Sequence, residues 1–301
     1  MKCCKVSNRG SNFKFLLGVA GVSAAAVLGS GIISVSSVRA NTYYSDMFTG
    51  GTTSSPQNLA GSTPSPTDTG GATWGVNTST GSSNPVTFQT NGTELTIATT
   101  LTNYSGPGIA YLPYTLPSVA GTSSVSAAIS LPVPYNNEFG WAAIGFLTGT
   151  SSSTIYSEAG PWMLVKNGGG IQVFADGLNQ VNSLNESNGV TLIPGFVPTD
   201  FYQFTVDYNS TTQTASWYEG TSAATQTLLA SYTYGGSNDA VPAVTDVGLG
   251  YLNSNNSGTP TQTVNVQNFQ LTTPSVPEPA SLGLMAAASL GLLLLKRRHR
   301  A

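Results

Sequence analysis

The sequence predicts an all-β fold for residues 41–271, built as one two-sheet jelly-roll sandwich. Three observations support this prediction. Short apolar or alternating runs recur between clusters of Gly, Asn, Ser and Pro, which is the pattern of consecutive strands and turns. No span between the two ends of the chain repeats apolar residues at the spacing of an amphipathic helix. The runs number fourteen, which suits one large sandwich better than two small domains.

Each expected strand is a short run rich in β-branched, aromatic or small apolar residues. The expected strands span residues 43–48, 86–89, 94–99, 108–115, 124–131, 139–147, 161–166, 170–176, 190–193, 201–208, 213–219, 227–233, 246–252 and 262–271. Two connections have their own turn chemistry. The glycines of 167–170 supply the positive φ of a tight hairpin, and 208–213 is expected to form a second hairpin loop.

Side-chain alternation predicts which strand faces are buried. Residues 139–147 are apolar on both faces, as in a central strand that is covered on both sides. Residues 201–208 alternate strictly, which predicts one wet face and one buried face. Residues 262–271 change phase in the middle, so a bulge near Gln267 and Asn268 is expected. The bulge would turn all four apolar residues of this strand inward: Val264, Val266, Phe269 and Leu271.

Two segments of the body are expected to lie outside the sheets. Residues 49–70 are rich in Gly, Ser, Thr and Pro, which predicts a long surface loop. Residues 272–275 are expected to form a short linker that follows the sandwich domain of residues 41–271.

Charge and reactive residues are distributed unevenly along the chain. Residues 41–275 contain twelve acids and one base, Lys166, for a net charge of −11, although the whole chain has only −3. This body would repel nucleic acid, which needs clustered Lys and Arg. Cys3, Cys4 and His299 all lie outside it. Disulfides, thiolate sites and histidine chemistry are therefore excluded from residues 41–275.

Residues 1–40 have the three parts of a secretory signal peptide. Four bases precede an apolar stretch, residues 15–29, and small residues then lead up to Ala40. We expect export through the Sec translocon and cleavage between Ala40 and Asn41. An uncleaved N-terminal anchor is the alternative.

Residues 276–301 combine three features in order. A box at residues 276–279 contains Pro277, Glu278 and Pro279, and an apolar run follows at residues 280–295. The run is slightly shorter than the roughly 17–25 residues of a spanning helix. A basic end at residues 296–300 would hold that side in the cytoplasm, and its charged residues are Lys296, Arg297, Arg298 and Arg300. We expect one short transmembrane helix here; a buried core helix is the alternative.

This tail resembles the PEP-CTERM sorting signal of Gram-negative bacteria that make exopolysaccharide. The Pro-Glu-Pro box, the apolar run and the basic end match the signal in order. The resemblance implies processing at the box by an exosortase, a membrane-embedded enzyme. It also implies that the protein is held in the inner membrane before processing, and that its destination is the cell surface or the extracellular matrix.

The body resembles concanavalin-like and laminin-G-like sandwiches. The likeness is carried by YYSDMF at 43–48, GATWGV at 71–76, residues 139–147, the hairpin of 208–220, and VNVQNFQL at 264–271. In such folds the first and last strands often lie side by side. The resemblance therefore implies that residues 43–48 lie beside residues 264–271.

Carbohydrate binding is one function that the residues of the body allow. Sugar sites combine aromatic faces with polar side chains that bond hydroxyls. Trp141, Trp162 and Trp217 are candidate stacking residues, although a core position is the favoured interpretation for any single tryptophan. Asp176 lies in FADGLNQ, which resembles the Ala-Asp-Gly of legume-type lectins. The residues that follow do not continue that motif, and an ordinary strand end and turn explains the stretch better.

Catalytic chemistry has little support. Without His or Cys in the body, Ser-His-Asp and Cys-His arrangements and the usual zinc sites are excluded. No acid-x-acid pair occurs. The sequence thus predicts a structural or adhesive protein, possessing no cofactor, that binds carbohydrate weakly at most. Three alternatives stay open: a glycosidase with a carboxylate pair, a lectin with a dedicated sugar site, and a structural calcium ion held by Asp46 and Asp246 if their strands meet.

Overall fold

A computed structural model describes the sandwich and leaves both ends of the chain outside its described residues. The described residues are 40–78, 86–99, 105–118, 120–132, 140–150, 159–166, 168–176, 179–181, 193–222, 224–235, 240–253 and 263–274. No helix long and apolar enough to cross a membrane occurs within these ranges. The expected signal peptide up to residue 39, the apolar run of 280–295 and the basic end lie outside them.

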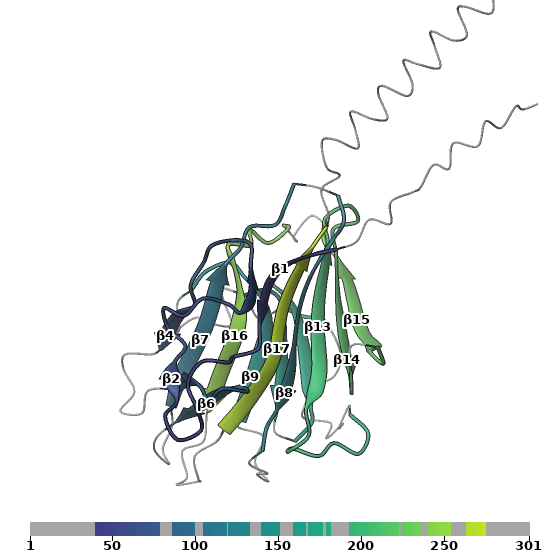
Figure 1. The fold of residues 1–301 in the computed structure, drawn as a ribbon. Helices are drawn as coiled ribbons and strands as arrows, with labels where there is room; N and C mark the ends of the chain where they lie inside the picture. The colour runs from purple at the N-terminus through teal and green to yellow at the C-terminus, as the bar shows by residue number, and fades with distance from the viewer. Residues whose placement is uncertain are drawn as a thin grey trace, which may run out of the picture. The chain divides into compact units, whose positions relative to one another are not determined.

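Two antiparallel sheets make up the described fold, as predicted for an all-β jelly roll (Figure 1). The ten-stranded sheet follows the order β15-β14-β13-β8-β17-β6-β5-β2, and β1 joins β17 to β3. Its strands are β1 Asn41–Asp46, β2 Gln57–Asn58, β3 Pro66–Asp68, β5 Val86–Thr90, β6 Leu95–Thr99, β8 Thr122–Ser130, β13 Tyr202–Asn209, β14 Thr214–Gly220, β15 Thr227–Thr233 and β17 Thr263–Thr273.

The seven-stranded sheet follows the order β12-β11-β10-β9-β16-β7-β4. Its strands are β4 Gly75–Thr78, β7 Ser105–Pro113, β9 Gly140–Leu147, β10 Ala159–Lys166, β11 Ile171–Asp176, β12 Asn179–Gln180 and β16 Asp246–Asn253. The doubly apolar run of 139–147 becomes β9, which has β10 on one side and β16 on the other. Its residues are buried on both faces, which confirms a central strand.

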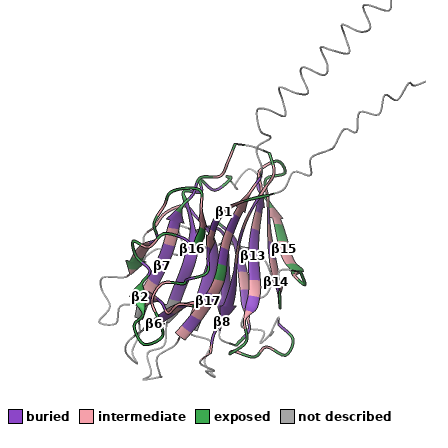
Figure 2. Ribbon diagram, viewed as in Figure 1, coloured by how far each residue is buried: buried purple, intermediate pink, exposed green. Residues whose placement is uncertain are grey.

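The main core fills the space between the sheets. Side chains of both sheets meet there, among them Phe204 from β13 and Met163 from β10. Figure 2 shows β8 mostly in the buried colour, whereas the edge strand β15 has no buried residue. The alternation predicted for β13 is present, but the opposite face is only partly wet, because Thr205 is 8% exposed.

The last strand confirms the predicted bulge and the predicted pairing. The register between β17 and β8 shifts between Gln267 and Gln270, and Asn268 has a φ of 52°. The extra residue turns the apolar side chains on both sides of the bulge into the core. β1 pairs with β17 from Asn41–Thr273 to Asp46–Phe269, so the first and last strands lie side by side.

Two expected boundaries are wrong. Residues 49–70 are not only a surface loop, because β2 and β3 lie within them and Leu59 is fully buried. β17 continues through Thr272 and Thr273, which were placed in the linker, because their backbone pairs with Thr42 and Asn41. Of the expected strand at 190–193, only Ile193 is described, and it is buried but not in a strand.

The predicted signal-peptide cleavage falls at the start of the described fold. Ala40 and Asn41 are both exposed, and Asn41 is the first residue of β1. A cut between them would therefore leave the pairing of β1 with β17 intact. The cleavage itself stays a prediction.

Candidate functional site

The outer face of the seven-stranded sheet carries a second cluster of apolar side chains. Trp162 and Leu164 alternate along β10 with Met163 and Val165, which belong to the core between the sheets. An outer face is ordinarily polar, so an apolar cluster there is unusual, and most of its side chains are buried. We call this cluster the aromatic face, and its residues are Ile109, Tyr111, Trp141, Ala143, Leu147, Trp162, Leu164 and Phe174.

The rings of the aromatic face are already engaged with one another and with a cation. The Trp162 and Phe174 rings stack with centroids 4.4 Å apart and an interplanar angle of 12°. Trp162 is consequently only 2% exposed. The Nζ of Lys166 lies 4.6 Å from the centroid of the Trp141 ring, which is a cation–π contact. Trp141 is half-buried, so part of its ring stays accessible.

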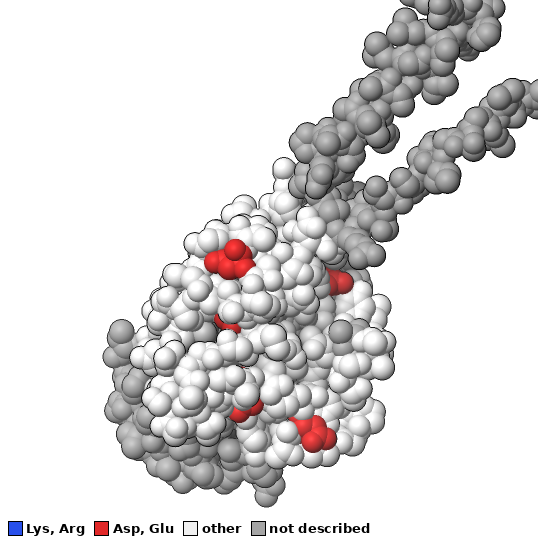
Figure 3. Space-filling view, in the orientation of Figure 1, with Lys and Arg blue, Asp and Glu red and all other residues white. Residues whose placement is uncertain are grey.

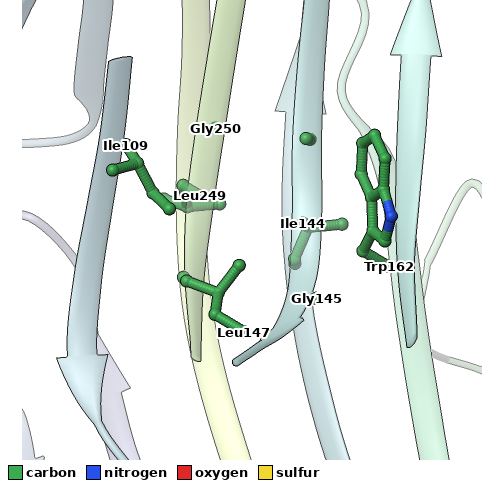
Figure 4. Close-up of a pocket in the computed structure, with 9 residues that line it drawn as sticks. Ile109, Ile144, Gly145, Leu147, Trp162, Leu249 and Gly250 are labelled. Atoms are coloured by element: carbon green, nitrogen blue, oxygen red, sulfur yellow. The ribbon is translucent and has the colours of Figure 1, made fainter. Parts of the chain in front are cut away.

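A small pocket lies in the middle of this sheet. Figure 4 shows Ile109, Leu147 and Trp162 around it, on neighbouring strands. Its volume of about 10 Å³ is far below the roughly 300–1,000 Å³ of ordinary ligand pockets. The glycines that line it are explained by packing, since a Cβ on Gly248 would lie 2.2 Å from the Ala110 carbonyl oxygen. The pocket is therefore too small for a sugar ring.

The structure brings three of the four predicted sugar-binding residues to this sheet. Trp141 and Trp162 belong to the aromatic face. Asp176 is exposed at the end of β11, two residues beyond Phe174, and the register of the β11–β12 pairing shifts between the two residues. Burial removes Trp162 as a stacking surface, and that part of the prediction is wrong. Trp141 is half-buried and Asp176 is exposed, so burial excludes neither of them from a ligand contact.

Trp217 is a core residue and not a sugar-binding residue. It is fully buried on the inner side of β14, and its Nε1–H donates a 3.0 Å hydrogen bond to the Trp162 carbonyl oxygen of the other sheet. A ligand cannot reach a side chain held between the two sheets. The prediction for Trp217 is therefore wrong.

Neither Phe174 nor Lys166 was predicted as a residue of the site. The side-chain alternation of the two strands could have identified both residues. Phe174 is in phase with Asp176, and Lys166 is in phase with Trp162. A single lysine in an acidic body is ordinary at the surface, and Lys166 is unusual because it is buried. Lys166 is 2% exposed, and its Nζ makes a cation–π contact with the Trp141 ring.

The proposed calcium ligands do not meet in one sheet. Asp46 ends β1 in the ten-stranded sheet, and Asp246 begins β16 in the seven-stranded sheet. Both Asp46 oxygens accept 2.7 Å hydrogen bonds, Oδ1 from the Phe48 backbone N–H and Oδ2 from the Trp74 indole N–H. Asp246 Oδ2 accepts one from the Thr245 hydroxyl. Burial raises the pKa of both carboxyls.

No group of three or more His, Cys, Asp or Glu side chains is gathered among the described residues. The condition for a calcium site at Asp46 and Asp246, that their strands meet, is not fulfilled, because β1 pairs with β17 and β3 only. Calcium binding by the protein stays a prediction.

The C-terminal tail gives the clearest comparison with known families. Residues 275–298 match the PEP-CTERM protein-sorting motif. This match confirms the resemblance drawn from Pro277, Glu278 and Pro279. It covers the tail alone and says nothing about the sandwich.

The sandwich is similar to lectin and lectin-like solved structures. Lectin II from Ulex europaeus is 11% identical with a TM-score of 0.44, covering 66% of this chain and 92% of that one. The Emp47p carbohydrate recognition domain is 13% identical with a TM-score of 0.47, covering 79% and 99%. Cellulose induced protein Cip1 is 14% identical with a TM-score of 0.45, covering 77% and 98%. At these identities the likeness concerns the fold alone. The comparison with curated proteins gives no match.

Proposed function

We propose that this protein is exported and is sorted through its PEP-CTERM tail to the surface or exopolysaccharide matrix of a Gram-negative bacterium. There the sandwich is a structural or adhesive module that binds carbohydrate weakly and catalyses no reaction. The observation that carries the proposal is the match of residues 275–298 to the sorting motif.

The order of the terminal segments supports this route. The signal peptide directs the chain to the Sec translocon, and the apolar run of 280–295 then holds the protein in the inner membrane. An exosortase-type enzyme acts at Pro277, Glu278 and Pro279. The sandwich, which lies before the box, is thereby transferred to the surface or the matrix.

The aromatic face supports weak carbohydrate binding. Trp141 offers a half-buried ring and Asp176 an exposed carboxylate on the same sheet, which is the combination that contacts sugars. Trp162 and Phe174 stack on each other and add no free ring face. One accessible aromatic residue predicts low affinity, so adhesion would depend on many weak contacts along a polymer.

A non-enzymatic role is supported by what residues 41–275 lack. They have no His and no Cys, and their single base is Lys166. Lys166 is buried against Trp141, so it is poorly placed to neutralise a substrate carboxylate.

Replacing Glu278 tests the sorting step. We expect Glu278→Ala to leave unprocessed protein in the membrane fraction, because the box that the processing enzyme recognises is broken. Immunoblots of membrane, surface and medium fractions measure the distribution. Asp200→Ala, which replaces an exposed acid of the sandwich outside the motif, is the matched control and should be processed as the wild type is. Release of Glu278→Ala at the wild-type level would contradict the proposal.

Replacing Trp141 tests the carbohydrate contact. We expect Trp141→Ala to weaken binding of the full chain to neutral polysaccharide about tenfold, which corresponds to the ~1.4 kcal/mol that one stacking ring contributes. A glycan array, followed by titration of the strongest ligand, measures the change. Tyr218→Ala removes a half-buried ring from the other sheet and should leave binding unchanged. Equal losses in the two variants would count against the aromatic face.

A further inference from the structure

A polar pocket lies beside β1 and β2, in the ten-stranded sheet and apart from the aromatic face. It is formed where the connection after β1 folds back along the sheet, and its volume is about 330 Å³. This volume falls within the roughly 300–1,000 Å³ of ordinary ligand pockets. The lining residues that carry the argument are Asp46, Phe48, Gln57, Asn58, Thr63 and Thr90.

Hydroxyl and amide groups dominate the walls of this pocket. Gln57 and Asn58 are exposed on β2, and Thr63 is exposed on the connection that follows. Asp46 contributes the one carboxylate, and it is 4% exposed. A ligand in this pocket therefore meets uncharged donors and acceptors at its mouth and a single acceptor group in its depth.

The backbone around the pocket is fixed before any ligand binds. The Met47 N–H donates to the Ser65 carbonyl oxygen at 2.8 Å, and the Leu59 N–H donates to Phe88 of β5 at 2.9 Å. The Gly61 N–H donates to the Trp74 carbonyl oxygen at 2.8 Å. A preformed pocket loses little conformational freedom on binding, so little of the binding free energy is lost to ordering it.

Phe48 gives independent support for a specialised site. Its φ is 54°, a left-handed conformation that is unfavourable for a bulky residue. The conformation is held by the Asp46 carboxylate, which accepts the Phe48 N–H, and by burial of the ring in the core. Strained residues held in this way are concentrated at ligand-contacting positions.

The charged residues around the pocket limit the class of ligand that it can bind. Figure 3 shows no Lys or Arg on the described part of the face that it displays. The only base of residues 41–275, Lys166, belongs to the other sheet, so nothing near the pocket attracts an anion. A calcium ion is coordinated by six to eight oxygen ligands. The pocket offers one carboxylate, whose two oxygens already accept hydrogen bonds.

We propose that this pocket binds a neutral sugar residue, either a monosaccharide or the uncharged terminal residue of a glycan. Sugar hydroxyls fit the walls, because each hydroxyl both donates and accepts. Gln57, Asn58 and Thr63 bond hydroxyls at the mouth of the pocket, whereas the Asp46 oxygens stay hydrogen-bonded to the Phe48 and Trp74 N–H groups. The inference goes beyond the contact proposed at Trp141 and does not depend on it.

Titration of the full chain with simple sugars tests this inference. The protein is purified in a zwitterionic detergent, which has no sugar headgroup, and titrated with methyl glucoside, methyl galactoside and methyl mannoside by calorimetry and saturation-transfer NMR. We expect at least one glycoside to bind with a Kd of about 1 mM. The double variant Gln57→Ala/Asn58→Ala should weaken that binding at least fivefold. Both side chains are exposed, so the fold should be retained.

Three controls make the test specific. Thr53→Ala changes an exposed residue of the same connection outside the pocket and should bind as the wild type does. Trp141→Ala should also leave monosaccharide binding unchanged, which separates this site from the aromatic face. Methyl glucuronide should bind more weakly than methyl glucoside. Binding that depends on Trp141 but not on Gln57 and Asn58 would overturn the inference and leave the proposed function standing, as would the absence of any binding by the three glycosides.

Discussion

We expect Trp217→Ala to lower the free energy of unfolding by about 3–5 kcal/mol, the range for a large buried aromatic residue replaced by alanine. Trp217 is fully buried between the sheets and donates its indole N–H to the Trp162 carbonyl oxygen. The substitution would remove a ring from the core and leave that oxygen without its donor. Because domains are stable by only about 5–15 kcal/mol, much of the stability would be lost. Urea unfolding followed by circular dichroism measures the change.

Two further variants test whether the lost stability comes from the buried ring of Trp217 and its indole N–H. Trp217→Phe keeps a ring in the core but removes the indole N–H, so its loss should be clearly smaller than that of the alanine variant. Trp141→Ala changes a half-buried tryptophan and should cost less than Trp217→Ala. If Trp217→Ala unfolded at the same urea concentration as the wild type, the placement of this side chain in the core would be wrong.

Asp46→Ala should have an effect of similar size, about 2–5 kcal/mol. The carboxylate accepts hydrogen bonds from the Phe48 backbone N–H and the Trp74 indole N–H, both at 2.7 Å in a buried site. Removing it leaves two buried donors without partners, and each unsatisfied donor costs about 1–3 kcal/mol. The left-handed backbone at Phe48 would lose its support as well. The same unfolding assay measures the loss.

A double-mutant cycle tests whether the lost stability comes from the hydrogen bond between Asp46 and Trp74. Trp74→Phe removes one of the two donors, so Asp46→Ala should cost less in that background than in the wild type. Asp68→Ala replaces a half-buried acid on the neighbouring strand β3 and is the matched control, with an expected change below about 1 kcal/mol. A loss for Asp46→Ala no larger than that for Asp68→Ala would contradict the role given to this carboxylate.

Strand positions could be predicted well because the strands alternate or are apolar throughout. The β15 range of 227–233 was predicted with both of its ends, and the phase change in residues 262–271 located the bulge at Asn268. Side-chain alternation could also have predicted that Trp217 is buried, since it is in phase with Ala215, which is buried as well. A tryptophan in the buried phase of an alternating strand is better predicted as core.

Residues 49–70 and the two candidate sites could not be predicted in the same way. Composition alone favours a surface loop for this segment, but Leu59 anchors it in the core, and β2 and β3 pair with distant strands. Such pairing depends on partners far along the chain, which local patterns do not report. The aromatic face and the polar pocket likewise form only when separate strands and connections are brought together.

The burial of Lys166 has a consequence for how the sandwich meets proteases. Proteases of the trypsin type cut after Lys or Arg, and they need an extended segment that can leave the fold. Residues 41–275 contain one such residue, and it is 2% exposed near the end of β10, which is paired on both sides by β9 and β11. The folded sandwich therefore offers these enzymes no accessible cleavage site, and reagents that label amines would find no free side chain within it.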